Sequence, residues 1–116
     1  MPEFMLLLFN GPGPGKPTTP ADMRAAVARY RAWAATVHKD GTPARGQKLA
    51  DDGGRELTPQ DGKVAVTDGP YSETKELLGG YFIVKAANYD EAVAIARGCP
   101  HLVARNRIVV RQLDEL

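Results

Sequence analysis

The six residues from Phe4 to Phe9 are all apolar, and they constrain the fold more than any other stretch of the chain. Side chains of a strand alternate between its two faces, so a strand with one solvated face alternates apolar and polar residues. Unbroken apolarity therefore predicts a strand that is buried on both faces. Six residues are far too few to cross a membrane. Because no basic segment precedes them, we do not expect a signal peptide either.

A long amphipathic helix is expected after this strand. Thr19 suits the N-cap and Pro20 the first helical position, and the helix is predicted to run to about Lys39 and to end before Gly41. Its apolar residues recur at steps of three and four and comprise Met23, Val27, Tyr30, Trp33, Ala34 and Val37. Tyr30 and Trp33 could line a pocket, but at this spacing we interpret them as core residues.

A second helix and further strands complete the pattern. Asn88 and Glu91 form a capping box at the start of the helix, which Gly98 ends. Strands are expected at Gln47–Ala50, Arg55–Thr58, Lys63–Thr67, Tyr81–Lys85 and Arg107–Leu113. The residues between the first two, 51–54, have the sequence of a hairpin turn. The order predicts one α+β domain over residues 1–116, a ferredoxin-like β-α-β-β-α-β unit with two helices on one face of an antiparallel sheet.

The predicted fold has too few helices to cover both faces of the sheet. Two helices can cover only one face, yet Phe4–Phe9 and Tyr81–Val84 have apolar residues for both. A bare apolar sheet face is an interaction surface. A second copy of the same face is the simplest cover, so we expect a two-fold homodimer.

Composition excludes several classes of partner. The formal net charge is +1 and the chain has no basic run, so neither nucleic acid nor an acidic membrane is expected to bind. The single cysteine, Cys99, cannot form an internal disulfide, which fits a cytoplasmic protein. His38, Cys99 and His101 lack the spacing of metal ligands, and no metal is expected.

The segment Asn10–Pro17, with the sequence NGPGPGKP, superficially matches a phosphate-binding loop. That motif needs Gly at the position of Asn10 and Ser or Thr at the position of Pro17. The three prolines of the segment also lack the backbone N–H groups that would bind phosphate. We therefore expect a stiff surface loop and no cofactor.

The connection between the strands at Lys63–Thr67 and Tyr81–Lys85 is the best candidate for a functional loop. At Asp68–Gly79 it is much longer than neighbouring strands require, and it is rich in charged residues. Pro70 fixes its own φ and forces Gly69 toward extended geometry, so the strand ends sharply. The alternative is a solvated loop whose charges only aid solubility.

This loop and the residues after it resemble a known family. The sequence TDGPYSETKELLGGYFIVKA, followed by NYDEAVAIARGCPHL and a valine-rich last strand, resembles the YCII-related (YciI-like) proteins. Within them it is similar to the group named for a DGPF motif, with Tyr71 in the Phe position. The resemblance extends over essentially the whole chain and implies a dimeric α+β barrel built from two ferredoxin-like protomers.

The resemblance implies less about activity. Some relatives carry out acid–base chemistry on small molecules, including dehalogenation of a chlorinated lactone, with a His and an Asp. In this chain the expected His falls near Asp22 and Met23, where there is none, and Cys99 replaces the expected Asp. The dyad therefore does not carry over to this chain.

Other groups could replace that dyad. We predict His101, Asp68 and Glu73 as catalytic residues, because a carboxylate can orient a histidine and raise its basicity. Lys75 could hold an anionic group of the substrate, and Tyr71 is expected beside it. The loop and His101 should then form one site in which the carboxylates raise the pKa of His101 above about 6.5. Each residue also has a structural alternative: His101 as a helix cap, Asp68 as a turn acceptor, Glu73 with Lys75 as a solvated pair.

Three functions stay open at this point. The first is an enzyme of lyase or isomerase type that binds a small, anionic molecule in a pocket at the dimer. The second is a ligand-binding or regulatory dimer without chemistry, a role that the resemblance allows because relatives are often linked with sigma-factor systems. The third is a purely structural dimer. A pocket in which His101 meets Asp68 or Glu73 would favour the enzyme.

Overall fold

The computed structural model describes residues 1–12, 19–69 and 76–116 of the chain. Strand β1, Glu3–Asn10, lies in the middle of a four-stranded sheet with the order β2-β5-β1-β6. Its neighbours are β5 on one side and β6 on the other, and every pairing is antiparallel. The remaining strands of the sheet are β2 at Arg45–Lys48, β5 at Leu77–Lys85 and β6 at Arg107–Gln112. The order is compatible with the predicted ferredoxin-like fold, and the α+β class is confirmed.

Helix α1, Pro20–Ala34, begins where the sequence predicts and ends earlier. The Thr19 hydroxyl accepts a hydrogen bond from the backbone N–H of Asp22 at 3.0 Å, as expected of an N-cap. The helix does not reach Lys39. Thr36 and Val37 are β-branched and poor helix formers, and the Thr36 hydroxyl donates to the Trp33 carbonyl at 3.0 Å instead. The last turn of the predicted helix is therefore a separate turn.

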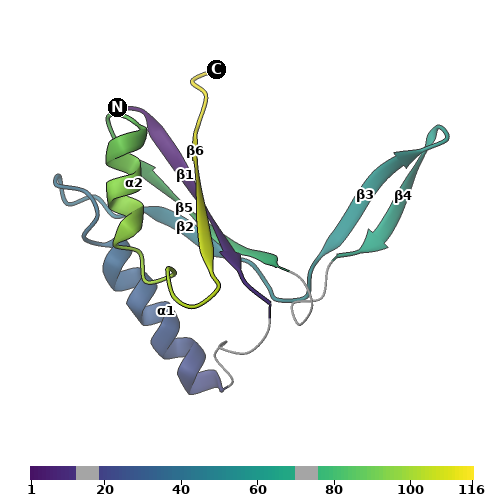
Figure 1. The fold of residues 1–116 in the computed structure, drawn as a ribbon, viewed down its shortest axis with the longest axis horizontal. Helices are drawn as coiled ribbons and strands as arrows, with labels where there is room; N and C mark the ends of the chain where they lie inside the picture. Colours follow the sequence, from purple (N-terminus) through teal and green to yellow (C-terminus); the bar gives the residue numbers. More distant parts are fainter. Residues whose placement is uncertain (13–18, 70–75) are drawn as a thin grey trace.

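Helix α2, Tyr89–Arg97, matches its prediction closely. The Asn88 side chain accepts a hydrogen bond from the backbone N–H of Glu91 at 2.9 Å, and Gly98 is the C-cap. Both helices lie on the same face of the four-stranded sheet (Figure 1). In the described part of the chain, no helix is long and apolar enough to span a membrane.

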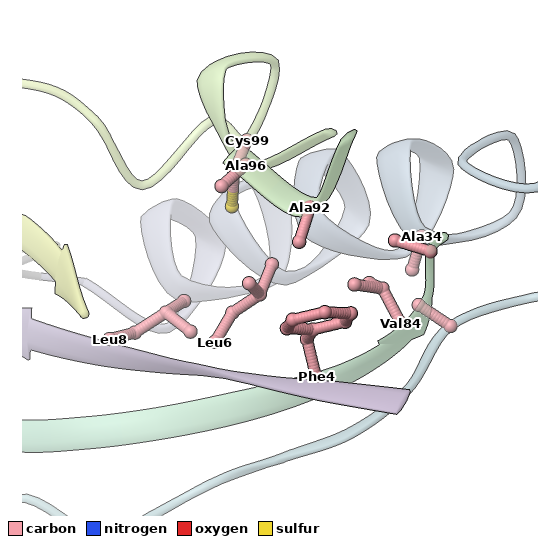
Figure 2. Packing of buried hydrophobic residues seen from close by; sticks show 10 residues of the cluster. Phe4, Leu6, Leu8, Ala34, Val84, Ala92, Ala96 and Cys99 are labelled. Atoms are coloured by element: carbon pink, nitrogen blue, oxygen red, sulfur yellow. The ribbon is translucent and has the colours of Figure 1, made fainter. Parts of the chain in front are cut away.

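The hydrophobic core fills the space between these helices and the sheet (Figure 2). Phe4, Leu6 and Val84 point from the sheet toward the helices and have no exposed surface. The helices contribute small side chains, chiefly Ala34, Ala92 and Ala96, with Cys99 just beyond α2. Small residues let the helix backbones approach the sheet closely, so the larger strand side chains fill the layer between them.

The remaining two strands form a hairpin of their own. Among the described residues, β3, Arg55–Gln60, pairs with β4, Lys63–Asp68, in a separate two-stranded sheet. Asp61 and Gly62 form its turn with positive φ values of 50° and 78°, as a two-residue turn of the primed type requires. We call residues 55–68 the arm, because this hairpin projects away from the helices and the main sheet (Figure 1).

The predicted hairpin turn at residues 51–54 is wrong. The strands on its two sides belong to different sheets, because β2 pairs with β5 and β3 pairs with β4. The chain reverses at Asp61 and Gly62 instead, and this turn brings Leu57 opposite Val66 on one face of the arm. Gly79, expected at the end of the loop, lies inside β5, as does Gly80.

Candidate functional site

His101 lies in the segment that follows α2, and it is almost completely buried, with 1% of its surface exposed. Its Nε2 atom lies 2.9 Å from the backbone carbonyl of Phe9, and its Nδ1 atom lies 3.0 Å from the Tyr30 hydroxyl. Because a carbonyl can only accept, Nε2 carries the proton, and the Tyr30 hydroxyl then donates to Nδ1. Both bonds suit a neutral imidazole, which ties α1 and the segment after α2 to the end of β1.

The electrostatics of His101 oppose the prediction made from the sequence. Burial lowers the pKa of His101 below 6.5, and the hydrogen bonds with backbone groups at Phe9 and Arg107 offset this only in part. The predicted rise in this pKa is wrong, because the ring is buried and no carboxylate of the described residues contributes to the shift. Burial also raises the pKa of the Tyr30 hydroxyl and of the Cys99 thiol. At neutral pH all three groups are therefore uncharged.

Asp68 occupies a very different place. It is the last residue of β4, its side chain is 76% exposed, and its Oδ1 atom lies 3.4 Å from Nε of Arg55. This ion pair closes the base of the arm. His101 instead follows α2 and bonds with Tyr30 of α1, and both helices lie on one side of the main sheet (Figure 1). Within one chain the structure therefore does not bring His101 and Asp68 together. The other predicted site residues, Tyr71, Glu73 and Lys75, lie outside the described residues.

Glu76, at the end of the same connection, holds Arg107 in a bidentate ion pair. Nε and Nη2 of Arg107 donate to its two carboxylate oxygens, each at 2.7 Å. The hydrogen bonds from Arg107 lower the pKa of Glu76, and the carboxylate in turn raises the pKa of Arg107. The Arg107 guanidinium also lies 4.3 Å from the centre of the Phe9 ring, a cation–π contact that fixes its position over the sheet.

The sheet face opposite the helices combines apolar and basic side chains. Residues paired across antiparallel strands share a face, so the register places Met5 in a row with Ile83 and Arg111, and Leu7 in a row with Tyr81 and Val109. We call this surface the open face. Its apolar members are half-buried in a single chain and comprise Met5, Leu7, Phe9, Leu78, Tyr81, Ile83 and Val109.

Arginines border the open face at both edges of the sheet. Arg111 and Arg107 lie on the β6 edge, and Arg45 lies on the β2 edge in register with Ile83. Arg45 donates to Glu3 at 2.9 Å. Among the described residues, Arg111 has no ion pair and no hydrogen-bonded carboxylate. The face thus joins an apolar centre to a guanidinium that can bind an anion.

In a single chain this face is not a closed pocket. The best-formed hollows of the described surface lie along α1, between Met23 and Arg31, and on the arm, between Gln60 and Ala65. Neither includes His101 or a residue of the open face. The described residues also contain no group of three His, Cys, Asp or Glu side chains that could hold a metal ion.

Sequence reasoning missed two features of this region. It assigned Tyr30 to the core, which is correct for the ring, but the hydrogen bond from its hydroxyl to His101 depends on how α1 and the segment after α2 pack. The second feature, the arginine edge, had a signal: Arg107, Val109 and Arg111 alternate along the last strand and must share a face. What the sequence left open was which face that would be.

Comparison with known proteins gives two findings. A family model described as the YCII-related domain matches residues 13–113. A protein of Rhizobium meliloti (strain 1021), described as uncharacterized, is 47% identical over 36 residues. That segment covers 31% of this chain and 29% of the relative, so the chain matches well under two thirds of the relative's length.

Proposed function

Because this chain belongs to the YCII-related family, we propose that it acts as a homodimer that binds a small, largely apolar anion between the open faces of its two copies. The observation that carries the proposal is the composition of the open face, which is apolar along its middle and has Arg111 at its edge. The proposed dimer is a closed α+β barrel in which the two sheets face one another.

In a single chain the apolar residues of the open face are less well covered than those of the helix side. Met5, Leu7 and Phe9 are half-buried, whereas their neighbours on the helix side of β1 are buried. A two-fold interface is self-complementary, since each copy presents the same patch to the other. Stacking two such faces removes apolar surface from water on both copies, and each Å² contributes roughly 25 cal/mol.

Arg111 supports an anion as the ligand. In a space between two apolar sheets, an unpaired guanidinium would lose hydration without gaining a partner, and such a loss is costly. A carboxylate or phosphate oxygen from a ligand would supply that partner, and arginine can bind it with two parallel hydrogen bonds. The apolar residues around it would contact the rest of the molecule, with the Tyr81 hydroxyl as a further polar group.

We place binding ahead of acid–base catalysis. His101, the base expected from the sequence, is buried on the helix side of the sheet, bonded through both ring nitrogens and neutral. It therefore faces away from the proposed ligand. Acid–base chemistry on that ligand would depend on Asp68 and Glu73, which we retain as catalytic candidates of lower rank.

The proposal is tested in two steps. Light scattering at micromolar concentration should give twice the 12.5 kDa mass of the chain, and a monomer would contradict the dimer. Calorimetric titration should then show binding of 1-naphthoate, an apolar carboxylate, and much weaker binding of the neutral 1-naphthalenemethanol.

Variants locate the anion. Arg111→Gln should weaken naphthoate binding about tenfold, the loss of one charge-assisted contact. Arg105→Gln is the matched control, because Arg105 is exposed in the segment before β6 and is not among the residues of the open face. It should bind as the wild type does. Equal binding by the wild type and both variants would show that Arg111 does not hold the anion.

A further inference from the structure

The arm defined above extends the molecule well beyond a compact shape. The radius of gyration is 16.0 Å, whereas a compact chain of this length would have about 13 Å. The principal extents of 49 × 41 × 19 Å reflect the same projection, which Figure 1 shows as a hairpin standing apart from the helices and the main sheet. Isolated two-stranded hairpins are marginally stable in water. The arm therefore needs a surface against which to pack.

The two faces of the arm differ in chemistry. One face carries the pairs Leu57 with Val66 and Pro59 with Val64, with the Arg55–Asp68 ion pair at its base, and these valines and the leucine are 60–63% exposed. The opposite face carries three cross-strand pairs that are mostly polar: Glu56 with Thr67, Thr58 with Ala65, and Gln60 with Lys63. The apolar face is thus an uncovered patch on an otherwise polar hairpin.

The arm is built to bind through this face and not through its β3 edge. A two-residue turn makes Gln60 and Lys63 a hydrogen-bonded pair, so the next pair, Pro59 and Val64, is a non-hydrogen-bonded one. The Pro59 nitrogen therefore points to the outer edge of β3, where it removes a donor that an added strand would need. A partner is expected to lie across the face of the arm.

We propose that the apolar face of the arm packs against the second copy of this chain, so that each copy clasps the other. This inference rests on the proposed dimer. The arm rises on the side of the main sheet opposite α1 and α2, which is the side that the second copy would occupy (Figure 1). A partner placed on the open face would therefore lie next to the arm.

The size of the open face supports the same occupant. Four strands of about six residues present on the order of 400 Å² in projection, from a spacing of about 4.8 Å and a rise of about 3.3 Å. Stable interfaces bury about 800 Å² on each partner. The two strands of the arm would add roughly half as much again as the sheet face, which brings the dimer closer to that value.

The first test measures how the arm affects dimer affinity. Val66→Asp places a charge on the apolar face of the arm, and Thr58→Asp places the same charge at mid-arm on the polar face. Dilution followed by light scattering should give a dissociation constant at least about tenfold higher for Val66→Asp and within about twofold of wild type for Thr58→Asp. Equal dissociation constants for wild type and Val66→Asp would overturn the role of the arm.

The second test needs no substitution. Amide hydrogen exchange of residues 63–68 in the wild type should slow as the concentration rises through the dimer dissociation constant, because the partner covers the arm. Fast exchange at all concentrations would overturn the inference while the dimer itself stood. A wild-type chain that is monomeric throughout would overturn the proposed dimer and, with it, the clasp.

Discussion

The two faces of the main sheet come from the same strands and have similarly apolar residues, yet they differ in burial. Phe4 and Leu6 face the helices and have no exposed surface, whereas Met5 and Leu7, their neighbours along β1, remain half-buried. Burial of a side chain is thus decided by what covers its face and not by its own hydrophobicity. The open face is apolar in the way that a core is apolar, and the dimer proposed above rests on this likeness.

The largest expected difference between the two faces is that between two adjacent leucines, Leu6 and Leu7. Leu6→Ala should lower the free energy of unfolding by about 3 kcal/mol, because it leaves a cavity in a closed core. Leu7→Ala should cost about 1 kcal/mol or less in dilute, monomeric protein, where its side chain is already half solvated. Urea unfolding of both variants at two protein concentrations measures the difference. At higher concentration the effect of Leu7→Ala should grow, and equal costs at every concentration would remove the distinction between the faces.

His101 is a buried polar residue on the side of the sheet that the helices cover, so its loss tests that side further. His101→Gln should destabilise the fold by about 2 kcal/mol, since two hydrogen bonds in a buried position are lost or weakened. Tyr30→Phe, which removes only the hydroxyl partner of Nδ1, should cost about 1 kcal/mol. A loss in Tyr30→Phe as large as that in His101→Gln would mean that the bond to Phe9 contributes nothing.

The pH dependence of stability reports whether folding lowers or raises the pKa of His101. Its folded-state pKa lies below the unfolded value of about 6.5, so the unfolded chain binds the proton more readily. The contribution of neutral His101 to the free energy of unfolding is therefore fully present above pH 6.5. It is lost as the pH falls from there through the folded-state pKa. Chemical unfolding between pH 7.5 and 5 should show a steeper decline in wild type than in His101→Gln. A steeper decline in the variant would reverse the sign of the shift.

A small effect is also expected at the base of the arm. Gly69 donates its backbone N–H to the Gly54 carbonyl at 3.1 Å, and a Cβ at this position would collide with the backbone of Gly53. Gly69→Val should therefore loosen the base of the arm at a cost on the order of 1 kcal/mol and leave the main sheet folded. Hydrogen exchange should quicken in residues 55–68 and stay unchanged in β1. Faster exchange in β1 would show that the arm and the sheet unfold together.

Local signals predicted most of the elements. The N-caps Thr19 and Asn88 are where they were expected, because each needs only a hydrogen bond to a backbone N–H three residues ahead. The strand at Phe4–Phe9 and the α+β order were predictable for the same reason. The pairing of β2 with β5 was not, since the turn residues at 51–54 are compatible with a hairpin and only contacts distant in sequence exclude it.

The candidate site, like the fold, could be predicted from the sequence only in part. From residue types alone, His101 and Asp68 are plausible partners. The sequence does not reveal that His101 is buried under the helices and that Asp68 is exposed on the arm. The shift in the pKa of His101 has the opposite sign to the prediction because burial depends on packing by Tyr30 and the end of β1. Alternation along Arg107–Gln112 groups the arginines on one face, but only the register sets that face beside Leu7 and Tyr81.

The sequence by itself determined where the helices begin, the central apolar strand, the α+β class and the apolar character of the second sheet face, because these follow from periodicity, caps and side-chain alternation. The tertiary structure alone decided that residues 55–68 leave the sheet as an arm, that His101 bonds with Tyr30 and that Arg111 borders an apolar surface. The physical reason is the range of the forces involved. Caps and turns depend on neighbours a few residues away, whereas pairing, burial and pKa values depend on residues that only the folded chain brings together.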